Sequence, residues 1–212
     1  MSADPMETAV ARVEEGGLVA YPTETVWGLG ADARSEQALA SLRDFKDRGE
    51  HAPISILIAG PDALAEMDFD FCEAARRLAG CFWPGPLTLV LRNQTRFARG
   101  VARGDGAVGV RCSSHPVARR LARELAKRGL GPLTATSLNR SGEPPACTRA
   151  EARHSCERDA AGPCLLAAPG PDAGGARAST VVDLTGARPE VLRWGALERS
   201  ELGPILQEVS PQ

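Results

Sequence analysis

The sequence predicts an α/β fold in which helices flank a twisted mixed sheet. Segments with helical spacing alternate with short apolar runs along the chain. Met6–Glu15 carries apolar residues at helical intervals, Gly16 and Gly17 end it, and the apolar run Leu18–Tyr21 follows as a strand. Short connections such as Val191–Arg193 leave room for antiparallel pairing, so we expect a mixed sheet.

Three segments continue this alternation in the first half of the chain. Ser35–Arg48 places its apolar residues on one face and is expected to be a helix, and Ile54–Ala59 is expected to be a strand. Phe71–Phe82 is amphipathic, and the prolines that follow end the helix because proline cannot continue one. Leu87–Leu91 then resumes as a strand.

The second half begins with a long polar loop and then repeats the pattern. Pro116 fits the first turn of a helix that reaches about Arg128. Thr148 and Glu151 form a capping box for a helix that ends near Cys156. Strands are expected at the remaining apolar runs, which are Val108–Arg111, Leu133–Thr136, Cys164–Ala168 and Ser179–Leu184.

Length and composition indicate one cytoplasmic domain over residues 1–212, with a core of about 6–195 and a short tail, 196–212. The 25 basic and 27 acidic residues give no overall attraction to nucleic acid or membrane. No apolar run approaches the roughly 20 residues needed to span a bilayer.

The six cysteines form no Cys-x-x-Cys pair, so no metal site is predicted. Pro169–Ala178 is expected to be a surface loop, with an inert connection slightly favoured over a mobile one.

Common catalytic motifs are missing. The sequence has no phosphate-binding Gly-x-x-x-x-Gly-Lys motif and no Gly-x-Ser-x-Gly elbow, and Gly28 with Gly30 lacks the third glycine of a dinucleotide fingerprint. Instead, three loops combine glycine with hydroxyl side chains, at Tyr21–Gly30, Trp83–Thr88 and Thr136–Gly142. Such loops can bind phosphate or carboxylate oxygens. Taken singly, each is more often a set of caps and turns.

Together these residues resemble the threonylcarbamoyl-adenylate synthases, the YrdC-like family, over about Gly17–Gly195. The resemblance rests on the order of several motifs, which are Tyr-Pro-Thr-Glu-Thr from Tyr21, Lys-x-Arg at Lys46 and Arg48, Trp-Pro-Gly-Pro-Leu-Thr from Trp83, Val-x-Val-Arg ending at Arg111, Ser-x-Asn-x-Ser-Gly from Ser137, Ser-Thr-Val-Val-Asp from Ser179 and Leu-Arg-x-Gly around Arg193.

The resemblance implies a large electropositive cavity and the formation of threonylcarbamoyl-AMP and pyrophosphate from L-threonine, bicarbonate or CO2, and ATP, for tRNA threonylcarbamoyladenosine modification. It also implies Mg²⁺ bound mainly through phosphates, partner proteins that receive the intermediate, and a weak tRNA contact. No membrane contact is expected.

Site residues are carried over by position. The threonine-contacting positions of the family match Thr25, Arg111, Ser137 and Ser179, and the ATP positions match Lys46, Arg48, Asn139 and Arg193. Lys46 and Arg48 are also the expected catalytic residues. The sequence departs from the family pattern at four positions near these motifs, Gly49, Leu57, Leu138 and Ala178.

Two other functions fit parts of the sequence. A noncatalytic RNA-binding module is suggested by the cations on the helix after Pro116, although no aromatic residue interleaves them and a solvated helix face is the simpler interpretation. Carbamoyl transfer is suggested by a related domain in hydrogenase-maturation enzymes, but the acylphosphatase-like and zinc-binding regions of those enzymes have no counterpart here.

Overall fold

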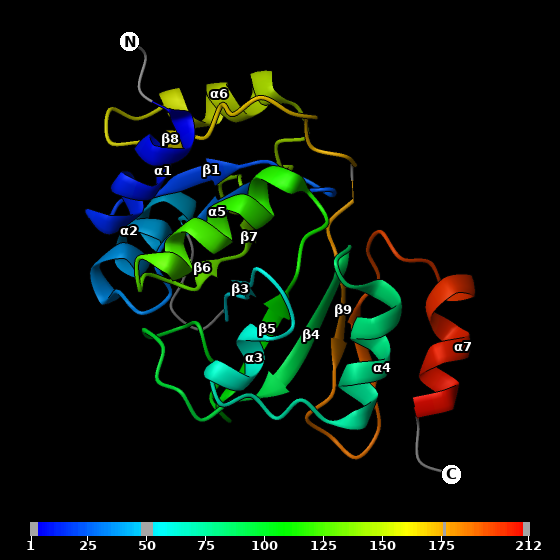
Figure 1. The fold of residues 1–212 in the computed structure, drawn as a ribbon. Helices are drawn as coiled ribbons and strands as arrows, with labels where there is room; N and C mark the ends of the chain where they lie inside the picture. The colour runs from blue at the N-terminus through cyan, green and yellow to red at the C-terminus, as the bar shows by residue number, and fades with distance from the viewer. Residues whose placement is uncertain (1–3, 48–52, 176, 210–212) are drawn as a thin grey trace.

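The described residues form two separate sheets, whereas the sequence led us to expect one. The structure is a computed structural model, and it describes residues 4–47, 53–175 and 177–209. The strand order is β7-β2-β1-β8 in the four-stranded sheet and β10-β9-β4-β5-β3-β6 in the six-stranded sheet. Figure 1 shows the first sheet among α1, α2, α5 and α6, and the second sheet beside α3, α4 and α7.

The four-stranded sheet is built around β1 (Val19–Tyr21), which pairs antiparallel with β2 (Gly28–Gly30) and parallel with β8 (Cys164–Leu165). The expectation that all of Thr23–Gly30 is a loop was therefore wrong for its last three residues. Gly28 lies against the Tyr21 ring, where an added Cβ would come within 2.6 Å of a ring carbon. Glycine thus lets the two strands of this hairpin approach closely.

The six-stranded sheet has a central antiparallel pair, β4 (Leu87–Arg92) and β5 (Ala107–Arg111). β4 also pairs parallel with β9 (Thr180–Asp183), and β5 pairs parallel with β3 (Ile56–Leu57), which is shorter than predicted. The last strand, β10 (Glu190–Arg193), pairs antiparallel with β9. The antiparallel pairing predicted near Val191–Arg193 is confirmed, but these residues belong to a strand rather than to a connection.

One short segment joins the two sheets. The predicted strand Leu133–Thr136 is divided at Ala135 into β6 (Leu133–Thr134), which pairs with β3, and β7 (Thr136–Ser137), which pairs with β2. The backbone N–H of Ala135 donates to the carbonyl of Ser55 at 2.6 Å. The chain therefore passes from one sheet to the other within a few residues.

The predicted helices are present with small changes at their ends. They are α1 (Pro5–Glu14), α2 (Glu36–Lys46), α4 (Glu73–Phe82), α5 (Pro116–Lys127) and α6 (Arg149–Glu157). Ser35 caps α2, and the predicted capping box of Thr148 and Glu151 is confirmed. Within the described ranges, no helix has the length and apolar character needed to cross a membrane.

Two helices were not predicted, the short α3 (Ala63–Glu66) and the C-terminal α7 (Arg199–Val209). We had expected only a short tail after residue 195. Leu202 of α7 is fully buried in the main core cluster, and Arg77 of α4 forms an ion pair with Glu208 of α7. Residues 199–209 thus contribute to the hydrophobic core.

Replacing Leu202 tests this contribution. We expect Leu202→Ala to lower the free energy of unfolding by about 2 to 5 kcal/mol, because it leaves a cavity in the core. The matched control is Gln207→Ala, an exposed position on the same helix that should change stability by less than about 0.5 kcal/mol. Urea unfolding checks both, and equal midpoints for the two variants would contradict the packing described.

Candidate functional site

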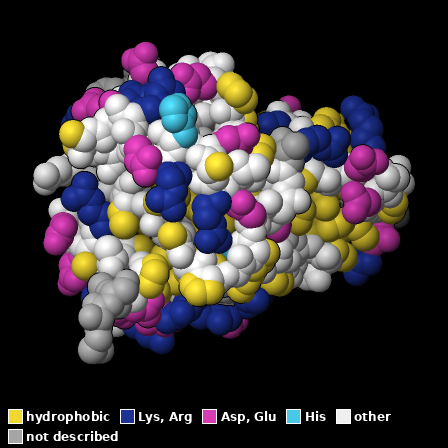
Figure 2. Space-filling view, turned by 90° about the horizontal axis from the view of Figure 1, so that it is seen from above, with side chains coloured by type: hydrophobic (Ala, Val, Ile, Leu, Met, Phe, Trp, Pro, Cys, Tyr) yellow, Lys and Arg dark blue, Asp and Glu magenta, His cyan; other side chains and the backbone are white. Residues whose placement is uncertain are grey.

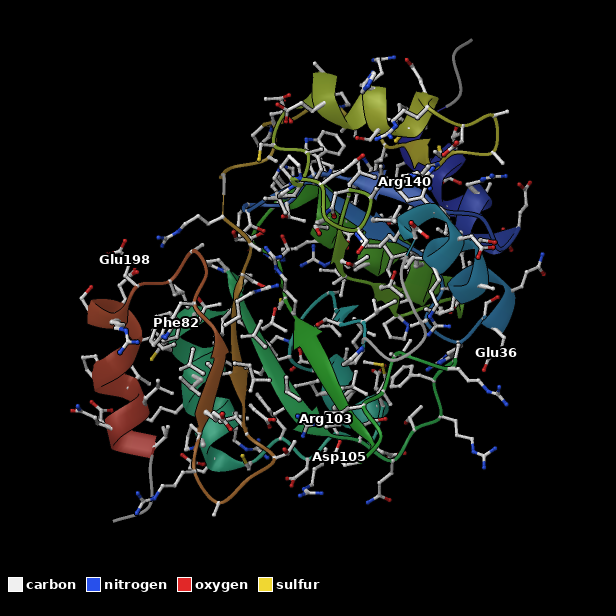
Figure 3. All side chains as sticks on the ribbon, turned by 180° about the vertical axis from the view of Figure 1, so that it is seen from behind. Glu36, Phe82, Arg103, Asp105, Arg140 and Glu198 are labelled. Atoms are coloured by element: carbon white, nitrogen blue, oxygen red, sulfur yellow. The ribbon has the colours of Figure 1, made fainter. Side chains whose placement is uncertain are left out.

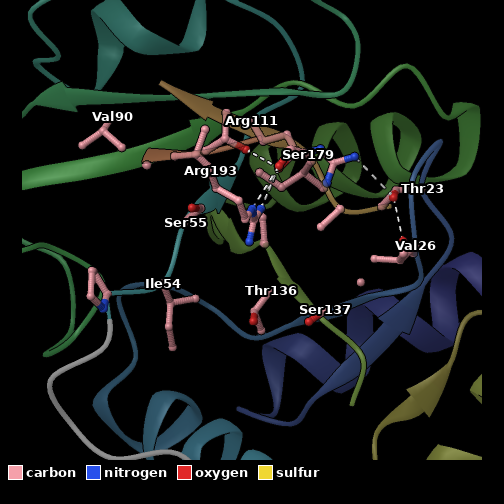
Figure 4. A pocket seen from close by; sticks show the side chains of 18 of the residues that line it. Thr23, Val26, Ile54, Ser55, Val90, Arg111, Thr136, Ser137, Ser179 and Arg193 are labelled. Atoms are coloured by element: carbon pink, nitrogen blue, oxygen red, sulfur yellow. Dashed lines mark hydrogen bonds between the residues drawn. The ribbon is translucent and has the colours of Figure 1, made fainter. Parts of the chain in front are cut away.

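A cavity of about 300 Å³ lies between the two sheets. The four-stranded sheet lines it with Tyr21, Gly28 and Ser137, and the six-stranded sheet lines it with Thr88, Arg111 and Arg193. Figure 4 shows Arg111, Arg193 and Ser179 close together on one wall, with Thr136 and Ser137 opposite. Both sheets are therefore needed to form the cavity.

Arg111, at the end of β5, is a buried cation of this cavity. Its Nη2 donates to Thr25 Oγ1 at 2.5 Å and lies 3.1 Å from Glu24 Oε1. Ser113, which is fully buried, donates its hydroxyl to the other oxygen of Glu24. Arg111 Nε is buried without a hydrogen-bond partner in the described part of the chain. Glu24 and Thr25 thus orient the guanidinium through Nη2.

The loop before β2 fixes the Thr25 hydroxyl. Thr23 Oγ1 donates to the carbonyl of Val26 at 2.6 Å, so it accepts from Thr25 Oγ1 at 2.9 Å. Thr25 in turn accepts from Arg111. Thr25 is fully buried, and Thr23 rather than Thr25 lines the cavity. In this structure the predicted threonine contact at Thr25 therefore acts on Arg111.

Ser179 and Arg193 form the second cluster of the six-stranded wall. Arg193 donates from Nε and Nη2 to the Ser179 carbonyl at 3.1 and 2.9 Å, and Ser179 Oγ lies 2.8 Å from Thr88 Oγ1. Burial, and then the positive charge of Arg111, lower the pKa of Arg193. Two cations that face one cavity and repel each other favour an anion between them.

Lys46 and Asn139 lie behind the opposite wall and contact Ser137, which lines it. Lys46 Nζ donates to the Ser137 carbonyl at 2.6 Å, to the Asn139 carbonyl at 3.0 Å and to Asn139 Oδ1 at 2.8 Å. Ser137 Oγ also donates to Asn139 Oδ1 at 2.7 Å. Lys46 is the last residue of α2, and its ammonium reaches this turn with only 3% of the residue exposed.

The structure brings most of the predicted site residues together. Arg111, Ser137, Ser179 and Arg193 line the cavity, whereas Thr25, Lys46 and Asn139 lie behind it and contact the lining residues. Arg48 and the departure at Gly49 fall outside the described residues. The other departures differ in place: Leu57 and Ala178 line the cavity, and Leu138 is fully buried in the core.

Sequence reasoning assigned no role to several residues of the site. Glu24 and Thr88 lie inside quoted motifs, so their positions could have suggested a role. Arg103 also lines the cavity, but it belongs to the long polar loop, where nothing in the local pattern marks it. It is held by Asp105 and Asp183, with N···O distances of 2.7 and 2.6 Å, at the end of the second sheet seen in Figure 3.

Residues 171–175 pack onto the loop that carries Thr23 and Thr25. The N–H groups of Gly174 and Gly175 donate to the carbonyls of Thr23 and Thr25 at 3.0 and 2.7 Å. Asp172 accepts from Trp27 Nε1 at 2.8 Å and from the backbone of Arg149 at 2.7 Å. This part of the predicted surface loop therefore holds the Thr23–Thr25 segment in place.

The fold and cavity define an α/β protein with arginine and hydroxyl side chains lining a cavity between its two sheets. The family model Sua5/YciO/YrdC, described as "Telomere recombination", matches residues 11–195. The chain belongs to this family.

Relatives of known name agree with that assignment. The chain is 36% identical over 199 residues to a putative threonylcarbamoyl-AMP synthase of Mycobacterium tuberculosis, covering 94% of this chain and 88% of that protein. It is 38% identical over 206 residues to the threonylcarbamoyl-AMP synthase of Pyrococcus abyssi, covering 95% of this chain and 57% of that one.

The crystal structure of P. abyssi Sua5 complexed with L-threonine superposes with a TM-score of 0.85 at 35% identity, over 97% of this chain and 58% of that chain. The present chain thus spans little more than half of the archaeal protein.

Tyr21, the only tyrosine of the chain, reports on the wall of the cavity. Its hydroxyl donates to the Thr134 carbonyl at 3.0 Å, and burial raises its pKa above the ordinary value of 10.0. We expect the ultraviolet absorbance of tyrosinate to be absent from the folded protein near pH 10, whereas the guanidinium-unfolded chain ionises there.

Because the folded pKa of Tyr21 is raised, its contribution to stability is complete below pH 10 and is lost as the pH rises further. If Tyr21 of the folded protein ionised with the ordinary pKa of 10.0, that result would contradict the burial described.

Proposed function

We propose that this chain synthesises threonylcarbamoyl-AMP from L-threonine, bicarbonate or CO2, and ATP, and releases pyrophosphate. The observation that carries the proposal is the cavity in which Arg111 and Arg193 of one sheet face Ser137 of the other, with Lys46 directly behind Ser137. The relatives named threonylcarbamoyl-AMP synthase support the reaction, and the threonine complex of the P. abyssi protein supports the amino-acid substrate.

The chemistry needs positioning rather than a nucleophilic side chain. The threonine amine loses a proton and its nitrogen bonds to the carbon of CO2, forming a carbamate. A carbamate oxygen then bonds to the α-phosphorus of ATP, and the bond from that phosphorus to the β-phosphate oxygen breaks to release pyrophosphate. The enzyme holds both substrates in line and stabilises the charge on the phosphates. An electropositive cavity would supply that stabilisation.

Two sets of residues share this task, and each set draws on both walls of the cavity. Arg111 receives the threonine carboxylate, Ser137 and Ser179 line the amino-acid site, and Thr25 holds the Arg111 guanidinium in place. Arg193, Asn139, Lys46 and Arg48 bind the triphosphate. Lys46 Nζ already donates to carbonyl and amide oxygens, so phosphate oxygens replace some of these acceptors when ATP binds.

Mg²⁺ is proposed to accompany ATP. In the described ranges, no three His, Cys, Asp or Glu side chains converge as a metal site. The ion would therefore be held by phosphate and water oxygens, which suits its preference for a largely hydrated octahedral shell. When bound it neutralises phosphate charge.

The product is a mixed anhydride for tRNA threonylcarbamoyladenosine modification, and we propose that partner proteins in the cytoplasm receive it. The alternative of a noncatalytic RNA-binding module is less well supported on α5, because several of its cations are paired. Arg120 lies 3.4 Å from Asp4, Lys127 lies 2.9 Å from Glu124, and Arg128, which directly follows α5, pairs with Glu7. Figure 2 likewise shows basic and acidic side chains interspersed on the face that it presents.

The direct test is to incubate the pure protein with ATP, Mg²⁺, labelled bicarbonate and single amino acids, and to follow pyrophosphate release. Threonine-dependent release with label in the nucleotide product is expected. Equal release with serine or with no amino acid would overturn the substrate assignment, and no release would overturn the enzymatic proposal for this chain.

Lys46 should be required for turnover. We expect Lys46→Met, which keeps an unbranched side chain but removes the charge, to lower kcat/KM at least about 100-fold, because the phosphates lose a donor in the transition state. The matched control, Lys127→Met, changes the chain's other lysine, whose side chain is 69% exposed on α5, and should leave kcat/KM unchanged. Circular dichroism checks that both variants fold; a folded, fully active Lys46→Met would contradict the assignment.

The Thr25 hydroxyl should affect threonine more than ATP. Thr25→Val preserves shape but removes the acceptor of Arg111, so we expect KM for threonine to rise about 10- to 150-fold, as for the loss of one hydrogen bond to a charged group. Thr25→Ser keeps the hydroxyl and should remain near wild type. Steady-state kinetics in both substrates decide this, and equal effects of Val and Ser would count against a role for the hydroxyl.

A further inference from the structure

His115 is a buried histidine to which the proposed reaction assigns no role. It is 4% exposed and directly precedes α5, where its Nδ1 caps the helix by accepting from the backbone N–H of Val117 at 3.2 Å. A ring nitrogen that accepts a hydrogen bond carries no proton, so in the neutral ring the proton lies on Nε2. Nε2 lies 3.2 Å from the Pro171 carbonyl, to which it donates. The two contacts thus select one tautomer.

The ring is neutral at pH 7. Burial lowers the pKa of His115 below its ordinary value of 6.5, against the opposing effects of the Pro171 carbonyl and of the Glu24 and Asp172 carboxylates. A second proton would lie on Nδ1, where the Val117 N–H already donates to the ring. The helix cap and the bond to Pro171 therefore depend on the same neutral ring.

Pro171 is the first residue of the segment 171–175, which packs on the Thr23–Thr25 loop. Backbone N–H groups of this segment donate to the carbonyls of Thr23 and Thr25. Figure 1 shows that the connection containing it runs from β8 in the first sheet to β9 in the second. The side chain of His115 thus fastens the start of the segment that holds the Thr23–Thr25 loop.

The backbone of His115 also reaches the surroundings of Arg111. Its N–H donates to Ser113 Oγ at 3.2 Å, and the Ser113 hydroxyl donates to Glu24. Glu24 Oε1 in turn lies 3.1 Å from Arg111 Nη2. One buried residue is therefore linked to both supports of Arg111, to the carboxylate through Ser113 and to the Thr23–Thr25 loop through the segment 171–175.

We propose that His115 is a positioning residue for the amino-acid site and acts through its Nε2–H bond to the Pro171 carbonyl. Loss of this bond loosens the segment 171–175 and the Thr23–Thr25 loop beneath it, so Thr25 holds the Arg111 guanidinium less firmly. The inference rests on the proposed function, because it takes Arg111 as the residue that receives the threonine carboxylate.

Two substitutions separate the two contacts of the ring. His115→Asn keeps a side-chain acceptor for the Val117 N–H, since asparagine is a strongly preferred N-cap residue, but it removes the donor to Pro171. His115→Gln places an amide nitrogen at the distance of Nε2 and keeps that donor, but it removes the cap. The matched control is His154→Asn, at an exposed position of α6.

Three measurements follow the segment, the site and the cap. Hydrogen exchange of the Gly174 and Gly175 amides reports on the segment without a ligand, calorimetric titration with L-threonine reports on the site, and urea unfolding reports on the cap. We expect His115→Asn to speed the exchange and to weaken threonine binding about three- to tenfold, as for the loss of one hydrogen bond, with an unchanged urea midpoint. His115→Gln lowers the urea midpoint and retains threonine binding.

The positioning role is overturned if His115→Asn binds threonine as the wild-type protein does, or if His115→Asn and His115→Gln weaken binding equally, since equal losses would leave only the helix cap. A comparable loss in His154→Asn would overturn it as well. If the wild-type protein itself binds no threonine, the proposed substrate fails and the inference fails with it, so the wild-type titration tells the two failures apart.

Discussion

A buried positive charge at the end of β5 organises the site. Arg111 is only 8% exposed, and a buried cation without compensation costs several kcal/mol. Glu24 supplies the opposite charge and Thr25 an acceptor, while Ser113 fixes the carboxylate from behind. The contacts of Glu24 and Thr25 with Arg111 therefore fix the loop between β1 and β2 against β5. This loop forms part of the cavity wall.

The same constraint extends to residues 171–175. Gly174 lies so close to the Glu24 backbone that an added Cβ would come within 2.7 Å of its carbonyl oxygen. Backbone N–H groups of this segment bond to the carbonyls of the Thr23–Thr25 loop, and Asp172 ties it to Trp27. Shortly after this segment, the chain reaches Ser179 and enters β9.

The local elements could be predicted because their signals are local. Helical spacing and the capping box of Thr148 gave the helices, and apolar runs gave the long strands. The division of Leu133–Thr136 could not be predicted, because four apolar and hydroxyl residues give no sign that their halves pair with different sheets. α7 was missed because Gly203 and Pro204 interrupt its pattern, and burial of Leu202 against the core outweighs them.

The candidate site was predictable as a set of motifs but not as a geometry. The resemblance assigned Ser137 to threonine and Lys46 with Asn139 to ATP, and the structure adds that the Lys46 ammonium bonds directly to the turn that carries Ser137 and Asn139. The contact between His115 and Pro171 could not be predicted, because it joins residues 56 positions apart and no local pattern links them.

The most direct test is a crystal structure of the protein with L-threonine and an ATP analogue whose α–β bridge cannot be cleaved. The account predicts both ligands in the one cavity, with the amino-acid carboxylate on Arg111 and the triphosphate between Arg193 and the Lys46 turn. Ligands on separate surfaces, or a triphosphate away from both cations, would contradict it.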